Sequence, residues 1–81
     1  MANSLILRDR RGYPWGGVTA TIYWVGGGHS SVWVGGSGVG EFNLSSGVVD
    51  RVKVAGETLY PKAGGRVNGT TQVVVQSENS H

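Results

Sequence analysis

The chain has 81 residues, no cysteine, 15 glycines and a net charge of +2. A chain of this length forms one small domain, here residues 1–81, whose thin core leaves much of its surface in water. The lack of cysteine excludes disulfides and thiolate metal sites, and the small positive charge makes nucleic acid an improbable partner.

The first predicted strand covers residues 4–8 and ends in a basic turn. Ser4 to Arg8 is a short apolar run, and the polar stretch after it ends in Gly12, which indicates a turn. Arg8, Arg10 and Arg11 surround Asp9 there. We interpret this cluster as a solvated turn, because no recognition helix accompanies it.

The central predicted element is a strand at residues 18–25. Pro14 cannot donate a backbone hydrogen bond, so the strand begins after it and after two glycines. Along the run, Ala20, Ile22 and Trp24 fall on one side and Tyr23 falls on the other. Side chains alternate between the faces of a strand, so this pattern predicts one apolar face.

A hairpin is predicted between this strand and the next one, at residues 30–34. The connection is rich in glycine, and several glycines can each adopt a positive φ, so the sequence leaves the register open. One register places Trp33 beside Ile22 and Trp24 on the core face. A shift by one residue places Trp33 beside Tyr23 on the outer face.

Four further strands are predicted at residues 40–44, 48–54, 57–60 and 70–76, with a loop over residues 62–69. No window shows helical spacing, so the sequence predicts an all-β fold without significant helix. The expected architecture is a small immunoglobulin-like or transthyretin-like β-sandwich of about seven short antiparallel strands. The expected inward residues are Ile22, Phe42, Leu44, Val52, Val54, Val73 and Val75; the expected outward ones are Arg51, Lys53 and Val74.

Three motifs resemble one family. They are Leu7-x-Asp9-x-x-Gly12-x-Pro14-x-x-Gly17-Val18-x-Ala20-x-Ile22, Gly40-Glu41-Phe42-x-Leu44 and Val52-x-Val54-x-Gly56. Together they are similar to carboxypeptidase regulatory-like domains, which are transthyretin-like sandwiches, over Leu5 to about Val75. Val39 departs from the acidic or amide residue that the family usually carries there. The resemblance implies a binding, spacer or assembly module of surface and adhesive proteins, and not a catalyst.

The inventory of reactive residues is short. His29 lies in a glycine-rich loop and His81 is the last residue, so neither has a local partner to orient it. A catalytic triad needs a nucleophile, a base and an orienting group on a rigid scaffold. We therefore expect no enzyme activity, no cofactor and no metal site.

Exposed aromatic residues are the better candidates for function, because they can anchor a protein interface or stack on sugar rings. Tyr13 and Trp15 flank a turn proline, and Tyr23 lies on the outer face of its strand. Trp33 joins them in one of its two registers. The alternative is that tryptophans fill gaps in a glycine-rich core, and it weighs more for Trp24 and Trp33 than for Tyr13 and Trp15.

Association is a further expectation. The strands at residues 4–8 and 70–76 lack proline, and Val74 points away from the core. An open edge with an exposed apolar group invites pairing with another chain. We expect a homo-oligomer or a subunit docked on a larger particle, with Val74 or the Tyr13–Trp15 turn at the contact.

The sequence thus favours a non-enzymatic module that docks other protein subunits, for example a decoration, fibre or adhesin component. The alternative is a carbohydrate-binding module that uses Tyr13, Trp15, Tyr23 and Trp33. The sequence contains no run of the ~20 apolar residues that a membrane span needs, and no signal peptide is visible. The chain is expected to be made without Sec export, or to be a piece of a larger surface protein.

Overall fold

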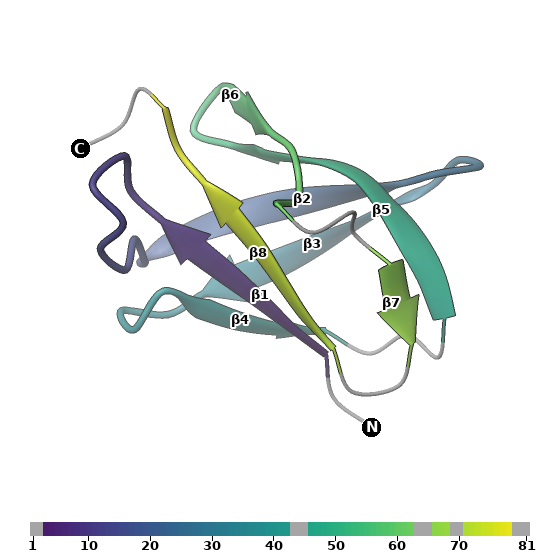
Figure 1. The fold of residues 1–81 in the computed structure, drawn as a ribbon, viewed down its shortest axis with the longest axis horizontal. Helices are drawn as coiled ribbons and strands as arrows, with labels where there is room; N and C mark the ends of the chain where they lie inside the picture. Colours follow the sequence, from purple (N-terminus) through teal and green to yellow (C-terminus); the bar gives the residue numbers. More distant parts are fainter. Residues whose placement is uncertain (1–2, 43–45, 63–65, 69–70, 79–81) are drawn as a thin grey trace.

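The computed structural model describes residues 3–42, 46–62, 66–68 and 71–78, which form eight strands and no helix. The strands make two sheets that face each other across one core, so the predicted all-β sandwich is confirmed (Figure 1). The strands are β1 (Asn3–Arg8), β2 (Val18–Trp24), β3 (His29–Val34), β4 (Val39–Phe42), β5 (Ser46–Val54), β6 (Glu57–Leu59), β7 (Arg66–Asn68) and β8 (Gln72–Gln76).

The smaller sheet has the order β4-β1-β8 and lies in front of the larger one in Figure 1. Its strands β1 and β8 run parallel, with Leu5 opposite Val73, so the prediction of antiparallel strands throughout was wrong for this pair. The expectation that residues 4–8 form an edge was also wrong, because β1 is the central strand of this sheet. Only β8, of the two strands proposed as edges, lies at one.

The larger sheet has the order β3-β2-β5-β6, and β7 pairs with the first residues of β5. The three-residue strand β7 lies inside the segment that was predicted to be a loop. Its single apolar residue, Val67, is buried, but one apolar residue between polar neighbours gives no detectable alternation.

The core between the sheets contains most of the residues predicted for it. Ile22, Val52, Val54 and Val73 are buried as expected. Phe42 is only partly buried, because it is the last residue of the edge strand β4, and its ring packs beside Trp24 with centroids 5.9 Å apart. Leu44 lies outside the described residues.

The two sheets also contact each other along both edges of the sandwich. On one side β4 passes so close to β3 that a Cβ added to Gly40 would lie 2.7 Å from the carbonyl oxygen of Trp33. On the other side the Lys62 N–H donates to the carbonyl oxygen of Val74 (3.0 Å). The Ser77 hydroxyl there donates to Glu57 Oε1 (2.7 Å). The two outer sheet faces therefore remain as the broad surfaces of the molecule.

Candidate functional site: the aromatic face of the larger sheet

The register of the β2–β3 hairpin decides where Trp33 lies. Thr19 is opposite Trp33 and Tyr23 is opposite His29, so these four residues share the outer face. The turn between the strands contains three consecutive glycines with φ between 88° and 115°, values that other residues rarely adopt. Trp33 therefore lies on the outer face, where 64% of it is exposed, but it is opposite Thr19 and not beside Tyr23 as the predicted outer register had it.

Tyr23 is the centre of a group of aromatic and basic side chains on the same face. The Arg51 Cζ atom lies 4.5 Å from the centroid of the Tyr23 ring, and the Lys53 Nζ atom lies 5.5 Å from it. The His29 ring is 5.9 Å away on the other side of the hairpin. His29 therefore has a neighbour that the sequence analysis did not foresee.

Regular pairing of β2 with β5 brings Arg51 to this position, and a β-bulge lies next to it. Tyr23 is opposite Arg51 but Trp24 is opposite Val49, so Asp50 is the extra residue on β5. The Asp50 carboxylate accepts a hydrogen bond from the Arg51 guanidinium and forms an ion pair with it. The bulge interrupts the pairing just before Arg51, and the Arg51 guanidinium lies over the Tyr23 ring.

We call this surface the aromatic face and define it by Tyr23, His29, Trp33, Arg51 and Lys53. Thr21 and Ser31 lie opposite each other between the two ends of the surface, and Thr19 lies at the Trp33 end. Along β2 the Tyr23 row and the Trp33 row are four residues apart, or roughly 13 Å. The surface thus has the exposed indole of Trp33 at one end. At the other end the Tyr23 ring lies under the side chains of Arg51 and Lys53.

Trp15 does not belong to any exposed surface, and its prediction as a binding residue was wrong. The backbone N–H of Trp15 donates to the carbonyl oxygen of Leu7 (3.0 Å), and Pro14 forms an isolated antiparallel β-bridge with Arg8. The chain therefore returns alongside the end of β1, and the Trp15 side chain enters the core with only 9% exposed.

Tyr13 is exposed, as predicted, but it stands on a separate turn. The Asp9 carboxylate accepts hydrogen bonds from the N–H groups of Arg11 and Tyr13, which fixes the turn. Because Trp15 points inward, Tyr13 and Trp15 do not form one surface.

Val74 is partly buried on the outer face of the smaller sheet. Its strand is an edge, but the carbonyl oxygen of Val74 already accepts the hydrogen bond from Lys62. The backbone of β8 is thus already hydrogen-bonded at this residue, and the Val74 side chain lies partly buried on the outer face.

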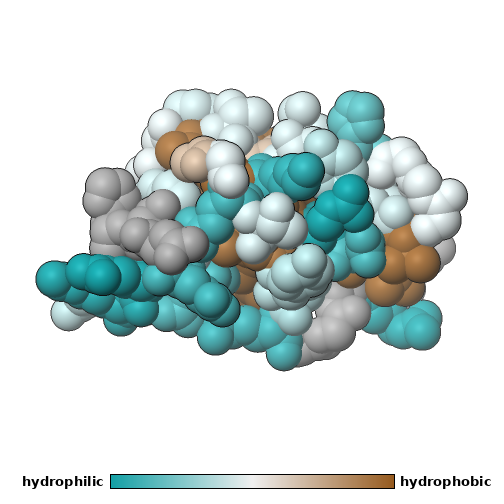
Figure 2. Space-filling view, turned by 90° about the horizontal axis from the view of Figure 1, so that it is seen from above, coloured by the Kyte–Doolittle hydropathy of each residue, from teal (hydrophilic) through white to brown (hydrophobic). Residues whose placement is uncertain are grey.

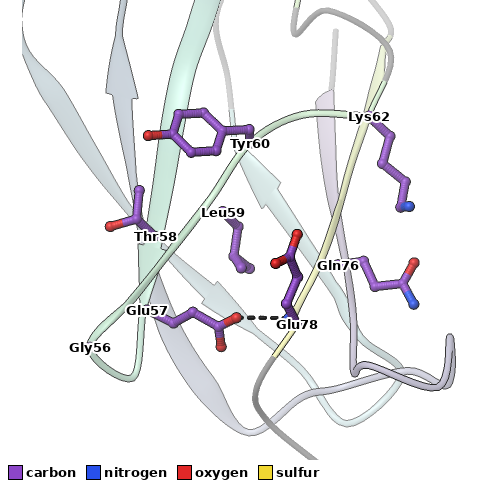
Figure 3. Close-up of a pocket in the computed structure, with 8 residues that line it drawn as sticks. All are labelled: Gly56, Glu57, Thr58, Leu59, Tyr60, Lys62, Gln76 and Glu78. Atoms are coloured by element: carbon purple, nitrogen blue, oxygen red, sulfur yellow. Dashed lines mark hydrogen bonds between the residues drawn. The ribbon is translucent and has the colours of Figure 1, made fainter.

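A polar groove of about 490 Å³ lies between β6 and the end of β8. Figure 3 shows Glu57 extending from β6 towards Glu78, whose N–H donates to Glu57 Oε2 (2.8 Å). Tyr60, Lys62 and Gln76 complete its walls. The view from above in Figure 2 shows a mainly hydrophilic surface with small, separate hydrophobic areas. The groove could not be predicted from the sequence, because its walls come from two segments with no shared motif.

The Glu57 carboxylate supports the fold, since it holds both Ser77 and Glu78 at the end of the chain. Among the described residues, no group of three His, Cys, Asp or Glu side chains is placed to hold a metal ion. The same residues contain no helix long and apolar enough to cross a membrane.

Comparison with known protein families, curated proteins and solved structures finds no match to this chain. The aromatic face is therefore judged on its geometry alone.

Proposed function

We propose that this chain is a non-enzymatic binding module whose aromatic face docks another protein. The observation that carries the proposal is an indole that is 64% exposed on the same face as the Tyr23–Arg51 stack. Trp, Tyr and Arg are the residue types that contribute most of the binding energy at protein interfaces. The family resemblance implies a module of surface and adhesive proteins, and a decoration, fibre or adhesin component would use such a face for attachment.

The side chains of the aromatic face also indicate the chemistry of the partner surface. The Trp33 ring would be buried in an apolar pocket of the partner. Such a pocket is the usual environment of an aromatic side chain that anchors an interface. Arg51 has five N–H donors, of which Asp50 occupies only some, and Lys53 adds a second positive charge. The partner surface should therefore have an apolar centre and carboxylates near it.

A second candidate is a glycan ligand, because two residues with hydroxyl groups lie on the same face near Trp33. Thr19 is directly opposite it, and Ser31 is two residues away on the same strand. A sugar ring stacked on the indole could exchange hydrogen bonds with these hydroxyls. The same variants test both candidates.

The test is affinity isolation of the native complex, with mass measurement of what is bound, for the parent, Trp33→Ala and Tyr60→Ala. Tyr60 is the matched control, because it is as exposed as Trp33 but lies at the polar groove. We expect parent and Tyr60→Ala to retain one stoichiometric protein partner, and Trp33→Ala to lose it. Salt should release the partner, because charges near its contact are screened.

A glycan array with the same three proteins decides between the candidates. Binding of a glycan that is lost in Trp33→Ala, without any protein partner, would establish the carbohydrate-binding alternative. A partner that Trp33→Ala retains at parent strength would show that the aromatic face is not the docking surface.

A further inference from the structure

The outer face of the smaller sheet carries an apolar row across all three of its strands. Ile6 is opposite Val39 on one side and opposite Val74 on the other, so the three side chains lie at one level. They alternate with the buried Leu5 and Leu7 of β1, and each is itself only partly buried. The three residues help to line a shallow hollow of about 230 Å³. We call them the apolar row.

Opposite charges lie on the two sides of this row. Arg8 is two residues beyond Ile6 on β1, on the same face. Glu41 lies on the other side of the row, opposite Ser4. The third strand contributes the neutral Gln72 and Gln76 at the corresponding levels. Measured along the strands, Arg8 therefore lies two residues from the apolar row on one side, and Glu41 lies two residues from it on the other side.

We propose that this face binds the same face of a second copy of the chain, about a twofold axis that runs along the apolar row. Such an axis brings Val39, Ile6 and Val74 each against its own counterpart. It also places Arg8 of one copy beside Glu41 of the other, twice per dimer. An interface with a twofold axis must be self-complementary. This face meets that requirement, because its apolar row meets itself and its basic residue meets the acidic residue of the other copy.

The other way of stacking the two faces has the axis along the strands. That arrangement brings Arg8 of one copy against Arg8 of the other, and like charges in contact oppose association. The charges therefore select the first arrangement, with the strands of the two copies roughly antiparallel. The inference does not depend on the proposed function, because it concerns the opposite sheet.

The size of the face sets the strength of the contact. Three short strands offer less than the ~800 Å² per partner of a standard stable interface. The association should therefore be reversible, and it should be visible at high chain concentration. Sedimentation equilibrium over a wide concentration range measures it directly.

The first test compares the parent with Val74→Lys and Thr19→Lys. Val74→Lys puts a charge in the apolar row and should weaken the dimer at least about tenfold. Thr19→Lys makes a similar change on a strand of the other sheet and should leave the dimer unchanged. A parent that stays monomeric at the highest concentration, or a Val74→Lys variant that dimerises like the parent, would overturn the proposal.

The second test uses charge reversal. Arg8→Glu gives a face with two acids, and Glu41→Arg gives one with two bases, so each variant alone should be monomeric. An equimolar mixture should form a heterodimer, because both cross-pairs are then attractive. The double variant should dimerise with itself. A mixture that stays monomeric while both variants keep the parent's circular dichroism spectrum would show that the symmetry is wrong.

A last comparison separates this inference from the proposed function. Trp33→Ala should lose the docked protein partner and keep the self-association, whereas Val74→Lys should do the reverse. A change in self-association on Trp33→Ala would place the contact on the aromatic face and contradict the proposal.

Discussion

The three tryptophans of this small domain have three different environments. Trp15 is in the core, and Trp24 is partly buried with its Nε1 donating to the Ser30 hydroxyl (3.1 Å). Trp33 is largely in water. Each environment is set by backbone geometry: the return of the chain beside β1 for Trp15, and the hairpin register for the other two.

These environments predict how the intrinsic fluorescence responds to a quencher. Acrylamide in solution collides mainly with exposed indoles, so Trp33 should supply most of the quenchable emission. Trp33→Phe should therefore lower the Stern–Volmer constant strongly, whereas Trp24→Phe should change it little. If the two variants quench alike, Trp33 does not lie on the outer face.

A second prediction at this scale concerns Glu57. Its carboxylate accepts a hydrogen bond from the Ser77 hydroxyl, which is buried, and another from the N–H of Glu78. Glu57→Ala removes an acceptor from a buried group and should cost about 1–3 kcal/mol in the free energy of unfolding. Urea denaturation measures this loss.

Glu78→Ala is the matched control, because Glu78 contributes a backbone N–H that alanine also supplies. Its free energy of unfolding should stay within about 0.5 kcal/mol of the parent. Equal losses in both variants would mean that the Glu57 carboxylate does not hold the end of the chain.

Among the elements, β3 of the larger sheet and β4 of the smaller one approach each other closely. A Cβ on Gly40 would lie 2.6 Å from Val32 Cγ1 as well as 2.7 Å from the Trp33 carbonyl oxygen, so Gly40→Ala forces the strands apart. Overpacking of this kind costs about 1–3 kcal/mol. We expect the melting temperature of Gly40→Ala to fall by about 4–8 °C for each kcal/mol.

Gly36→Ala is the control for this substitution. An added Cβ at Gly36 meets no atom within 4 Å, and Gly36 does not have a positive φ. Its melting temperature should stay near that of the parent or rise slightly, because alanine restricts the unfolded chain. A Gly40→Ala protein as stable as Gly36→Ala would contradict the close approach.

The strands with clear alternation were predictable, since β2 presents an apolar face at every second residue and β5 does so from Val52 to Val54. The direction of β8 was not, because a strand with one apolar face can pair either way. The central place of β1 was not predictable either, because alternation along one strand does not show how many neighbours it pairs with. The short strand β7 has too few residues to show a period.

The candidate site was predictable in part. Tyr23 and Trp33 were named, and Arg51 and Lys53 were expected to point outward. Their meeting on one face depends on the register of β2 with β3 and on its register with β5, and neither is encoded in a local pattern. Trp15 was misassigned because a turn proline gives no sign of which way the next side chain points.

At the scale of the whole molecule, the two proposed surfaces lie on the opposite outer faces of one sandwich. A dimer formed through the apolar row leaves both aromatic faces free, and it presents them on its two far sides. Because these two faces point away from each other, they cannot both bind one flat surface, so the dimer gains no avidity on a single particle. Under the two proposals, the dimer would instead link two partner molecules, one on each side.

Such a role requires the two sheets to behave as one body, and their shared core predicts that they do. Leu5 belongs to the smaller sheet and is completely buried, whereas Trp24 and Trp33 belong to the larger one. Leu5→Ala should lower the free energy of unfolding by about 2–5 kcal/mol, a large part of the 5–15 kcal/mol typical of a domain. Because the core is common, the tryptophan fluorescence and the far-ultraviolet circular dichroism should shift to the same lower urea midpoint. Ile6→Ala, on the outer face of the same strand, should shift both signals much less. A fluorescence transition that stays in place while the circular dichroism moves would mean that the sheets unfold separately, and a dimer of smaller sheets could not then hold two aromatic faces in fixed positions.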